Sequence, residues 1–316
     1  MTRLLITRRL PQANIDLAKA HFDVTMRDRT DGLSAFEARD ALADYDAILP
    51  TLGDDFGAEA FAGSEIRCGV LANFGVGTNH IDVEAARTAG VAVSNTPDVV
   101  TDATADLALT LILAACRRAG EGERLVRAGK WTGWGPTEML GTHVTGKTVG
   151  IVGMGRIGQA VAHRCHSGFG MPVLFFNRST KGTEVPALQL DTLEELMAEA
   201  DIVVICVPGG AGTRGLIDAG ALSAMKPGGI FINVSRGDVV DEPALIDALS
   251  RGAIAAAGLD VYAAEPHVPE ALRALENVVL LPHLGTAALE VRVAMGRMAI
   301  DNVLAWSRGE ALPQGL

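Results

Sequence analysis

Three side chains able to bind anions or transfer protons each follow an apolar run in the second half of the sequence. Arg236 follows GIFINVS, Glu265 follows AGLDVYAA, and His283 follows NVVLLP. Each run predicts a buried strand, and open parallel sheets bind ligands beyond the carboxyl ends of their strands. We therefore expect the three side chains at one edge of a sheet. Taken singly, each could instead be a solvated loop charge or a hydrogen-bonded structural histidine.

A glycine-rich turn precedes these groups. The segment TVGIVGMGRIGQAVAHR places Gly153, Gly155 and Gly158 in GxGxxG spacing between a predicted strand and a predicted helix. Such glycines permit a tight turn, close approach of the backbone to a pyrophosphate and close helix packing, while the N–H groups at the helix start attract the anion. Because the next strand, VLFF, also comes at βαβ spacing, the pattern predicts a dinucleotide site rather than a plain turn.

The strand VLFF ends in Asn177, Arg178, Ser179 and Thr180, and Asn177 lies 19 residues after Gly158. In dinucleotide-binding units an acidic residue about 20 residues beyond the glycines holds the ribose hydroxyls of NAD. This segment has no acid, and a guanidinium flanked by hydroxyls suits a phosphate dianion. The segment favours NADP(H), with NAD(H) possible. The alternative is that Arg178 only stacks on the adenine.

The elements that must position these residues fall into two series. RLLIT, FDVTM, DAILP, CGVLAN and VAVSN predict strands that alternate with helices over residues 1 to about 95, and a second series runs from TVGIVG to NVVLLP. A long helical stretch, ATADLALTLILAACRRAGEGERLVRAGKW, lies between them. This rhythm predicts two α/β domains with parallel sheets, comprising residues 1–98 with 288–316, and 99–287. The final amphipathic helix is expected to return to the first domain and close a cleft.

Length and composition indicate the number of domains and exclude some kinds of partner. The length of 316 residues favours two domains over one core. Lys and Arg number 27 against 38 Asp and Glu, and the net charge of -11 would repel nucleic acid. The N-terminus lacks a signal-peptide profile, and the longest apolar run, Leu107 to Cys116, is too short to span a bilayer. A cytoplasmic protein without a membrane partner is expected.

The cysteines and a histidine pair offer two further candidates for chemistry. The four cysteines form no CxxC pair and are expected to be inert thiols in a reducing compartment. They are Cys68, Cys116, Cys165 and Cys206. His163 and His166 share a helix face in HRCH, but a fourth ligand is not apparent nearby, so no metal site is predicted.

Five motifs in order connect the chain with a known family. NFGVGTNHIDV, VGMGRIGQAVA, NVSRGDVVDEPAL, GLDVYAAEP and LPHLGTA resemble the D-isomer-specific 2-hydroxyacid dehydrogenases over nearly the full length. Within that family, GKWTGWGPTEMLG and the non-acidic NRS are most similar to the glyoxylate/hydroxypyruvate reductases. The resemblance implies two Rossmann-like domains with an intervening cleft: a flavodoxin-like substrate-binding domain and a dinucleotide-binding domain. It also implies NADPH-dependent reduction of small 2-oxo acids such as glyoxylate and hydroxypyruvate.

The resemblance assigns the three charged groups to catalysis. Arg236 would clamp the 2-oxo acid and polarise its carbonyl, and His283 would donate a proton as hydride arrives at C2. Glu265 would orient the imidazole and favour its charged form. Formate-oxidising relatives have Gln in place of this carboxylate, so Glu265 suits reduction of 2-oxo acids.

Substrate contacts are implied in the same way. The backbone N–H groups of Val76 and Gly77 would bind the substrate carboxylate, and Leu52 would border the substrate. An ordinary strand-to-helix turn at NFGVG is the alternative. Trp134 would cross a homodimer interface into the neighbouring subunit's pocket, although Trp131 and Trp134 could simply pack within their own chain.

The implied cofactor contacts extend beyond the glycines. Asp260 would hold the nicotinamide carboxamide, or could equally cap a turn. The full expected set is Thr104, Gly153, Gly155, Arg156, Ile157, Gly158, Asn177, Arg178, Ser179, Val207, Pro208, Thr213, Val234, Asp260 and Gly285.

Two other functions stay open at this point. One is oxidoreduction of broader 2-oxo acids, 2-ketogluconate or phosphite. The other is a dinucleotide-sensing binding protein, as some relatives are transcriptional corepressors.

Overall fold

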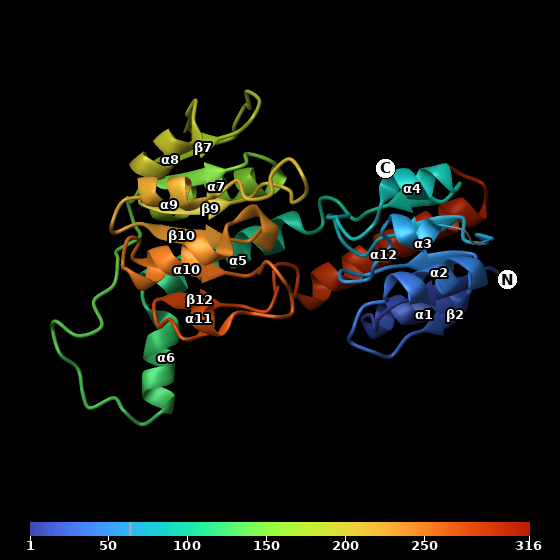
Figure 1. Ribbon diagram of the computed structural model, residues 1–316, viewed down its shortest axis with the longest axis horizontal. Coiled ribbons are helices and arrows are strands. Elements are labelled where there is room, and N and C mark those ends of the chain that lie inside the picture. Colours follow the sequence, from blue (N-terminus) through green and yellow to red (C-terminus); the bar gives the residue numbers. More distant parts are fainter. Residues whose placement is uncertain (63–64) are drawn as a thin grey trace. The chain divides into compact units, whose positions relative to one another are not determined.

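The structure, a computed structural model, describes residues 1–62 and 65–316. These residues form two compact units, unit 1 (Met1–Val100 and Thr286–Leu316) and unit 2 (Thr101–Gly285). Each is built on a parallel sheet covered by helices, so the predicted α/β class with two parallel-sheet domains is confirmed (Figure 1). Within the described ranges, no helix has both the length and the apolar character needed to cross a membrane.

Unit 1 contains a five-stranded parallel sheet in the order β2-β1-β3-β4-β5 among its described residues. Its strands are β1 (Arg3–Ile6), β2 (Asp23–Met26), β3 (Ala47–Leu49), β4 (Val70–Ala72) and β5 (Ala92–Ser94). Its helices are α1 (Gln12–His21), α2 (Ala35–Asp44), α3 (Ala58–Phe61), α4 (Val83–Thr88) and α12 (Leu289–Ser307). This strand order is that of a flavodoxin-like sheet.

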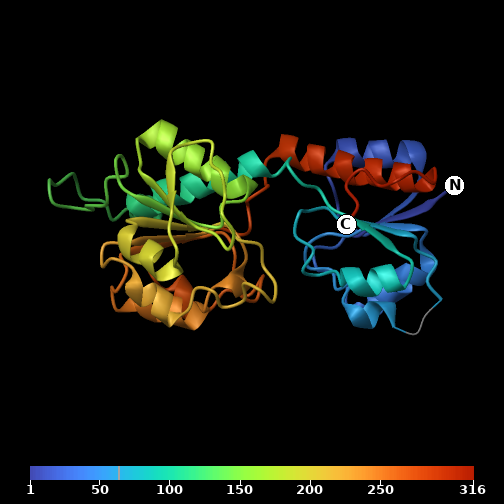
Figure 2. The ribbon, with the colours of Figure 1, turned by 90° about the horizontal axis from the view of Figure 1, so that it is seen from above.

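Helices cover both faces of this sheet. The buried residues of α1 and α12 share one apolar cluster with β1, β3 and β4. The residues of α2, α3 and α4 form a second cluster on the other face. Figure 2 shows α1 and α12, blue and red, together on one side of the unit. Burial on both faces explains why the central strands β3 and β4 are continuous apolar runs rather than alternating ones.

Unit 2 contains a seven-stranded parallel sheet in the order β12-β11-β10-β9-β6-β7-β8. Its strands are β6 (Val149–Val152), β7 (Val173–Phe176), β8 (Ala187–Gln189), β9 (Ile202–Ile205), β10 (Ile230–Asn233), β11 (Ala256–Leu259) and β12 (Val278–Leu280). Its helices are α5 (Thr101–Cys116), α6 (Ala119–Arg127), α7 (Arg156–Phe169), α8 (Leu193–Glu199), α9 (Ala219–Ala224), η1 (Gly237–Val239), α10 (Glu242–Ser250) and α11 (Glu270–Arg273). The order reverses between β6 and β9, which is where open sheets of this kind bind ligands.

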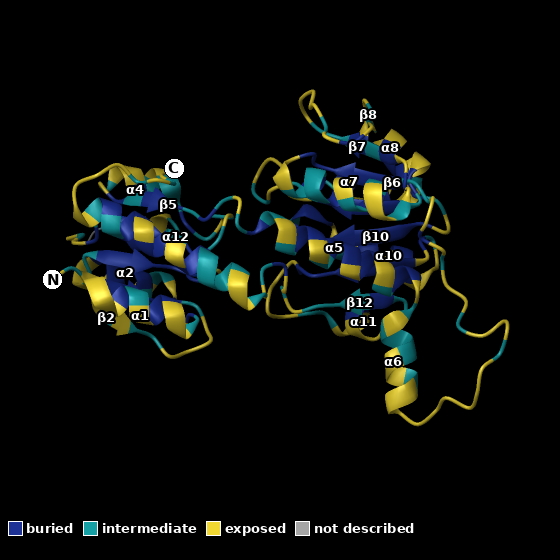
Figure 3. Ribbon diagram, turned by 180° about the vertical axis from the view of Figure 1, so that it is seen from behind, coloured by how far each residue is buried: buried dark blue, intermediate teal, exposed yellow. Residues whose placement is uncertain are grey.

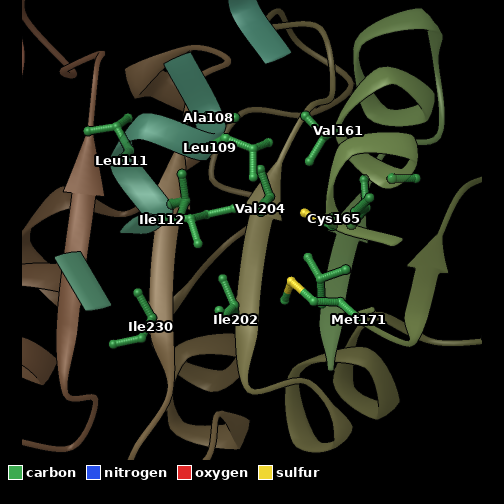
Figure 4. Packing of buried hydrophobic residues seen from close by; sticks show 14 of the residues in the cluster. Ala108, Leu109, Leu111, Ile112, Val161, Cys165, Met171, Ile202, Val204 and Ile230 are labelled. Carbon is green, nitrogen blue, oxygen red and sulfur yellow. The ribbon is translucent and has the colours of Figure 1, made fainter. Parts of the chain in front are cut away.

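The core of unit 2 lies on both faces of its sheet. On one face, Leu109 and Ile112 of α5 and Val161 of α7 pack over Ile202 and Val204 of β9 (Figure 4). On the other face, α8, α9 and α10 bury a second apolar cluster. The central strands β6, β9, β10 and β11 are buried throughout their lengths. They therefore hold the loops that follow them on a rigid base.

The structure differs from the sequence expectation at two elements. Strand β8 is not apparent from the sequence, because it is a short edge strand whose Leu188 faces solvent. The long predicted helix before the second sheet is divided into α5 and α6 at Arg118. Arg118 has a left-handed backbone conformation (φ 52°) and pairs with Glu121 in the first turn of α6. None of the residues of α6 is buried, and Figure 3 shows α6 and the segment after it largely exposed.

Candidate active site

The three predicted catalytic residues lie beyond the carboxyl ends of three neighbouring strands. Arg236 follows β10, Glu265 follows β11, and His283 follows β12. These strands pair in parallel, β10 with β11 and β11 with β12. The loops therefore emerge at the same edge of the sheet in unit 2, as the positions of the three residues in the sequence predict.

Glu265 and His283 form a direct pair. The His283 Nδ1 lies 2.8 Å from the Glu265 Oε2, and the Tyr262 N–H donates to the other carboxylate oxygen at 3.0 Å. Burial alone would raise the pKa of Glu265, but the His283 and Tyr262 hydrogen bonds and the Arg236 charge outweigh it, so the pKa is lowered. Both side chains remain 29% exposed. The imidazole is thus oriented by a carboxylate while its Nε2 has no acceptor or donor among the described residues.

Asp260 holds the turn that carries His283. The Leu284 and Gly285 N–H groups donate to its two carboxylate oxygens at 2.6 and 2.8 Å, and the His283 N–H donates to its carbonyl at 3.0 Å. The turn needs this support because His283 has a positive φ of 54°, which is uncommon for a residue other than glycine. Burial raises the pKa of Asp260 despite these bonds. The turn-capping alternative for Asp260 is therefore present in the structure.

Arg236 is held by its own loop. Its Nη1 donates to the Ser235 carbonyl at 2.7 Å, and the Asn233 side-chain amide donates to the Arg236 carbonyl at 3.0 Å. Burial lowers the pKa of Arg236, with Glu265 and Asp238 acting in the opposite direction. Its other guanidinium nitrogens have no hydrogen-bond acceptor in the described part of the chain. A poorly hydrated cation with unused donors suits a small anion.

The three glycines of the turn after β6 have different structural roles. Gly153 has a positive φ of 97°, and a Cβ there would lie 2.9 Å from the Val207 nitrogen. A Cβ on Gly158 would lie 2.2 Å from the Gly153 carbonyl oxygen, so this glycine permits the packing of α7. A Cβ on Gly155, the N-cap of α7, would meet nothing within 4 Å. Space beside Gly155 and the amino end of a 14-residue helix fit a pyrophosphate.

The loop after β7 is organised around Asn177. Its amide nitrogen donates to the Ser179 carbonyl at 2.8 Å, and its amide oxygen accepts from the Met154 N–H at 3.3 Å. Arg178 is exposed and forms no ion pair within the described residues, and its Nη1 lies 3.5 Å from where a Cβ on Gly212 would be. The guanidinium thus lies beside the glycine-rich loop that follows β9, with donors available.

The remaining predicted cofactor residues of unit 2 lie around the same edge. Thr213 is buried and donates to the Pro208 carbonyl at 2.6 Å, which closes the loop after β9. Thr104 lies 3.4 Å from the Gly285 carbonyl oxygen. Arg156 and Ile157 open α7, and Val207 and Val234 follow β9 and β10.

The predicted substrate loop in unit 1 follows β4. Neither the Val76 nor the Gly77 N–H has a hydrogen-bond acceptor among the described residues, although the carbonyls around them are bonded. Leu52 follows β3 and is partly exposed, and its carbonyl accepts from Arg8. The structure therefore places two successive free amides beyond one strand of unit 1 and Leu52 beyond another.

Trp134 does not join the residues at the strand ends of unit 2. It lies in the segment after α6, where its side chain is 84% exposed, and Trp131 in the same segment is also exposed. Trp134 therefore packs little against the described residues of its own chain.

The cysteines and the histidine pair add nothing to the site. Cys68, Cys116 and Cys165 are buried and Cys206 is half-buried, and all four are free thiols. Burial raises the pKa of Cys116 to about 11 and of Cys165 to about 12, which keeps them protonated. In the described ranges no three His, Cys, Asp or Glu side chains are placed to hold a metal ion.

Several residues that support the site are not predicted from the sequence. Tyr262 and Asn233 hold Glu265 and Arg236, and Asn73 and Asn95 bond the carbonyls of the loop after β4. The signal available in the sequence is position alone, because Asn73 and Asn95 directly follow an apolar strand and Asn233 is the last residue of one. Which backbone groups they bond depends on the loop conformation.

Comparisons with known proteins identify relatives of the chain. Residues 109–285 match the family described as D-isomer specific 2-hydroxyacid dehydrogenase, NAD binding domain. The chain is 42% identical to a glyoxylate reductase of Thermococcus kodakarensis and 40% identical to one of Pyrococcus furiosus. Each alignment covers 98% of this chain and 95% or 94% of the relative.

A solved structure is also similar. It is the NADPH-dependent glyoxylate/hydroxypyruvate reductase of Sinorhizobium meliloti, in complex with NADP and malonate. The two chains are 34% identical with a TM-score of 0.88, and the match covers 100% of this chain and 96% of the other.

Proposed function

The chain belongs to the D-isomer-specific 2-hydroxyacid dehydrogenases and is a nicotinamide-dinucleotide-dependent oxidoreductase, and we propose that it reduces small 2-oxo acids, glyoxylate and hydroxypyruvate first. The observation that carries this proposal is the Glu265–His283 pair, 2.8 Å apart at the ligand-binding edge of a dinucleotide-binding sheet. The relatives named as glyoxylate reductases support the choice of substrate.

The cofactor supplies a hydride to C2 of the substrate when it is bound. The chain contributes the place for it: the open space at Gly155, the amino end of α7 and the loops around Thr213 and Gly285. We propose that the other expected contact residues of unit 2 bind the same cofactor. They are Thr104, Gly153, Arg156, Ile157, Gly158, Asn177, Arg178, Ser179, Val207, Pro208, Val234 and Asp260.

His283 holds the proton for the substrate oxygen on Nε2. Glu265 accepts from Nδ1, which fixes the ring and stabilises the imidazolium from which the proton leaves. After transfer, the neutral imidazole keeps its Nδ1–H on the carboxylate and so stays in place for reprotonation. A lowered pKa keeps Glu265 charged throughout this cycle at neutral pH.

Arg236 binds and polarises the 2-oxo acid through its unused guanidinium donors. The Val76 and Gly77 N–H groups bind the substrate carboxylate, and Leu52 borders the substrate and limits its size. Neutral amide donors and one guanidinium together match a small monoanion with an adjacent carbonyl.

NADPH is the preferred reductant in this proposal. Arg178 follows β7 where NAD-specific sites have an acid, it has free donors, and Ser179 lies next to it. The similar Sinorhizobium meliloti enzyme is named as NADPH-dependent and was crystallised with NADP.

The exposed segment after α6 supports a homodimer. Val126 in the last turn of α6 and Trp131, Trp134 and Leu140 after it are all exposed, and several large exposed apolar side chains on one part of a surface are typical of a protein interface. In the dimer, Trp134 would enter the partner's substrate pocket. The four free thiols support a reducing, cytoplasmic location.

A turnover assay tests the proposal. Purified protein with NADPH and a panel of 2-oxo acids should show loss of nicotinamide absorbance, fastest with glyoxylate and hydroxypyruvate. His283→Ala should lower kcat on the order of 10²–10⁴-fold while leaving NADPH affinity nearly unchanged. Absence of turnover with every acid, despite NADPH binding, would favour a dinucleotide-sensing protein instead.

A further inference from the structure

The loop Asn73–Asn79, which follows β4, has an uncommon distribution of hydrogen bonds. It contains no charged residue, and every carbonyl from Gly75 to Gly77 is bonded. The N–H groups of Val76 and Gly77 have no acceptor among the described residues. Donors left free beside fully bonded carbonyls indicate that the loop is built to offer N–H groups to an anion.

Two asparagine side chains supply these carbonyl bonds. The Asn73 Nδ2 donates to the Gly75 and Gly77 carbonyls, at 3.0 Å each. The Asn95 Nδ2 donates to the Val76 carbonyl at 2.9 Å. Together they bond the carbonyls of three successive peptide groups.

Bonding a carbonyl fixes the N–H of the same peptide group. In a trans peptide the C=O and N–H point in opposite directions, and the peptides of this loop are trans. Holding the Gly75 carbonyl toward Asn73 therefore turns the Val76 N–H away from Asn73. In the same way, Asn95 turns the Gly77 N–H away from itself by holding the Val76 carbonyl.

Asn73 is itself held rigidly. Its side chain is fully buried, and its Oδ1 lies 3.1 Å from the His80 Nε2. Because the amide nitrogen is committed to two carbonyls, the oxygen must accept, so His80 carries its proton on Nε2. The Asn73 N–H also donates to the Ser94 carbonyl at 2.9 Å, and the Thr96 N–H donates to the Gly75 carbonyl at 3.0 Å. These bonds connect the loop to the end of β5.

We propose that Asn73 and Asn95 are positioning residues that preorganise the Val76 and Gly77 N–H groups to bind the carboxylate of the 2-oxo acid. The inference rests on the proposed function and deepens it, because it assigns residues that contact no substrate. Preorganisation matters here because a glycine-rich loop would otherwise lose conformational entropy on binding.

Asn95→Ala is the main test, since Asn95 is half-buried and its loss should be tolerated. The KM for glyoxylate and the inhibition constant of oxamate, a non-reducible analogue, should both rise about tenfold, as when a hydrogen bond to a charged group is weakened. The kcat should fall less than KM rises, and the KM for NADPH should stay constant. Asn73→Ala should show a larger effect of the same kind.

Asn14→Ala is the matched control. Asn14 is a buried asparagine of unit 1 whose Nδ2 donates to the Val293 carbonyl at 2.9 Å, away from this loop. Its loss should lower the melting temperature without raising the glyoxylate KM. If Asn95→Ala behaves in the same way, or raises the KM for NADPH as much as that for glyoxylate, the inference is wrong.

Calorimetric titration of oxamate into the NADPH-saturated protein separates the two proposals. If wild-type protein reduces no 2-oxo acid, the proposed function fails, but weaker oxamate binding by Asn95→Ala would still support the inference. Equal oxamate binding by both, or none by wild type, would overturn the inference whatever the turnover.

Discussion

Both oxygens of the Glu265 carboxylate are engaged, one by the His283 Nδ1 and one by the Tyr262 N–H. Desolvation would favour the protonated acid, yet the pKa of Glu265 is lowered because these contacts and the Arg236 charge prefer the carboxylate. The lowered pKa therefore keeps the Glu265 carboxylate charged over the neutral pH range. Its contribution to stability should disappear only in acid.

Glu265→Gln should reveal this in the pH dependence of unfolding. A lowered folded-state pKa contributes stability that is complete above the unfolded pKa, about 4.3, and is lost as pH falls through the folded value. Wild type should thus have a higher melting temperature than the variant at pH 7 and still at pH 5, with the difference shrinking below about pH 4. A difference that is constant from pH 7 to pH 3 would contradict this assignment.

Arg178→Ala should change the choice of cofactor. If the guanidinium binds the 2'-phosphate, its loss should raise the KM for NADPH roughly tenfold or more and leave that for NADH nearly constant, because a charge-assisted hydrogen bond contributes about 1.5–3 kcal/mol. Initial rates with both cofactors at saturating glyoxylate measure this. Equal losses for the two cofactors would indicate that Arg178 only stacks on the adenine.

At the scale of the elements, two glycine substitutions in the turn between β6 and α7 should have different effects. Gly158→Ala would place a Cβ 2.2 Å from the Gly153 carbonyl, so it should lower the melting temperature by several degrees. Gly155→Ala meets no atom of the chain and has a φ of -79°, so its fold should be intact. If that space takes the pyrophosphate, Gly155→Ala should still weaken NADPH binding about tenfold or more. NADPH binding is measured by fluorescence titration. An unchanged affinity would contradict the assignment of the pyrophosphate to the space beside Gly155.

The sequence predicts the buried elements well because burial leaves a clear pattern. Eleven apolar runs, from RLLIT to NVVLLP, each contain one strand, and parallel pairing brings Arg236, Glu265 and His283 to one edge. Strand β8 leaves no such pattern, since an edge strand with an exposed Leu188 buries little. The division between α5 and α6 depends on the backbone of Arg118, and both its neighbours are good helix formers.

The supporting hydrogen bonds could not be predicted in the same way. From the sequence alone, Asp260 could bind the nicotinamide carboxamide or cap a turn. In the structure, its carboxylate accepts from two N–H groups of the turn at residues 283–285. Asn73 and Asn95 bond loop carbonyls whose directions depend on individual backbone dihedrals. Residue type and spacing identify groups that can react, whereas the groups that orient them are visible only in three dimensions.

At the scale of the whole molecule, the two units offer different chemistry beyond their strands. Unit 1 offers neutral backbone donors at Val76 and Gly77, and unit 2 offers the charged groups and the glycine turn. In the proposed function, the size of the substrate is limited by two apolar side chains, Leu52 of this chain and Trp134 of the proposed partner.

The last prediction concerns that partner. Sedimentation should give twice the chain mass of 33.0 kDa, because the exposed apolar side chains after α6 would be buried in a dimer. Trp134→Ala should widen the partner's pocket and raise kcat/KM for 2-oxo acids with bulky side chains roughly tenfold relative to glyoxylate. Trp131→Ala, on the same segment, is the control and should weaken the dimer without altering the substrate order. A monomeric wild type would contradict the dimer, and an unchanged substrate order in Trp134→Ala would leave Trp134 outside the pocket.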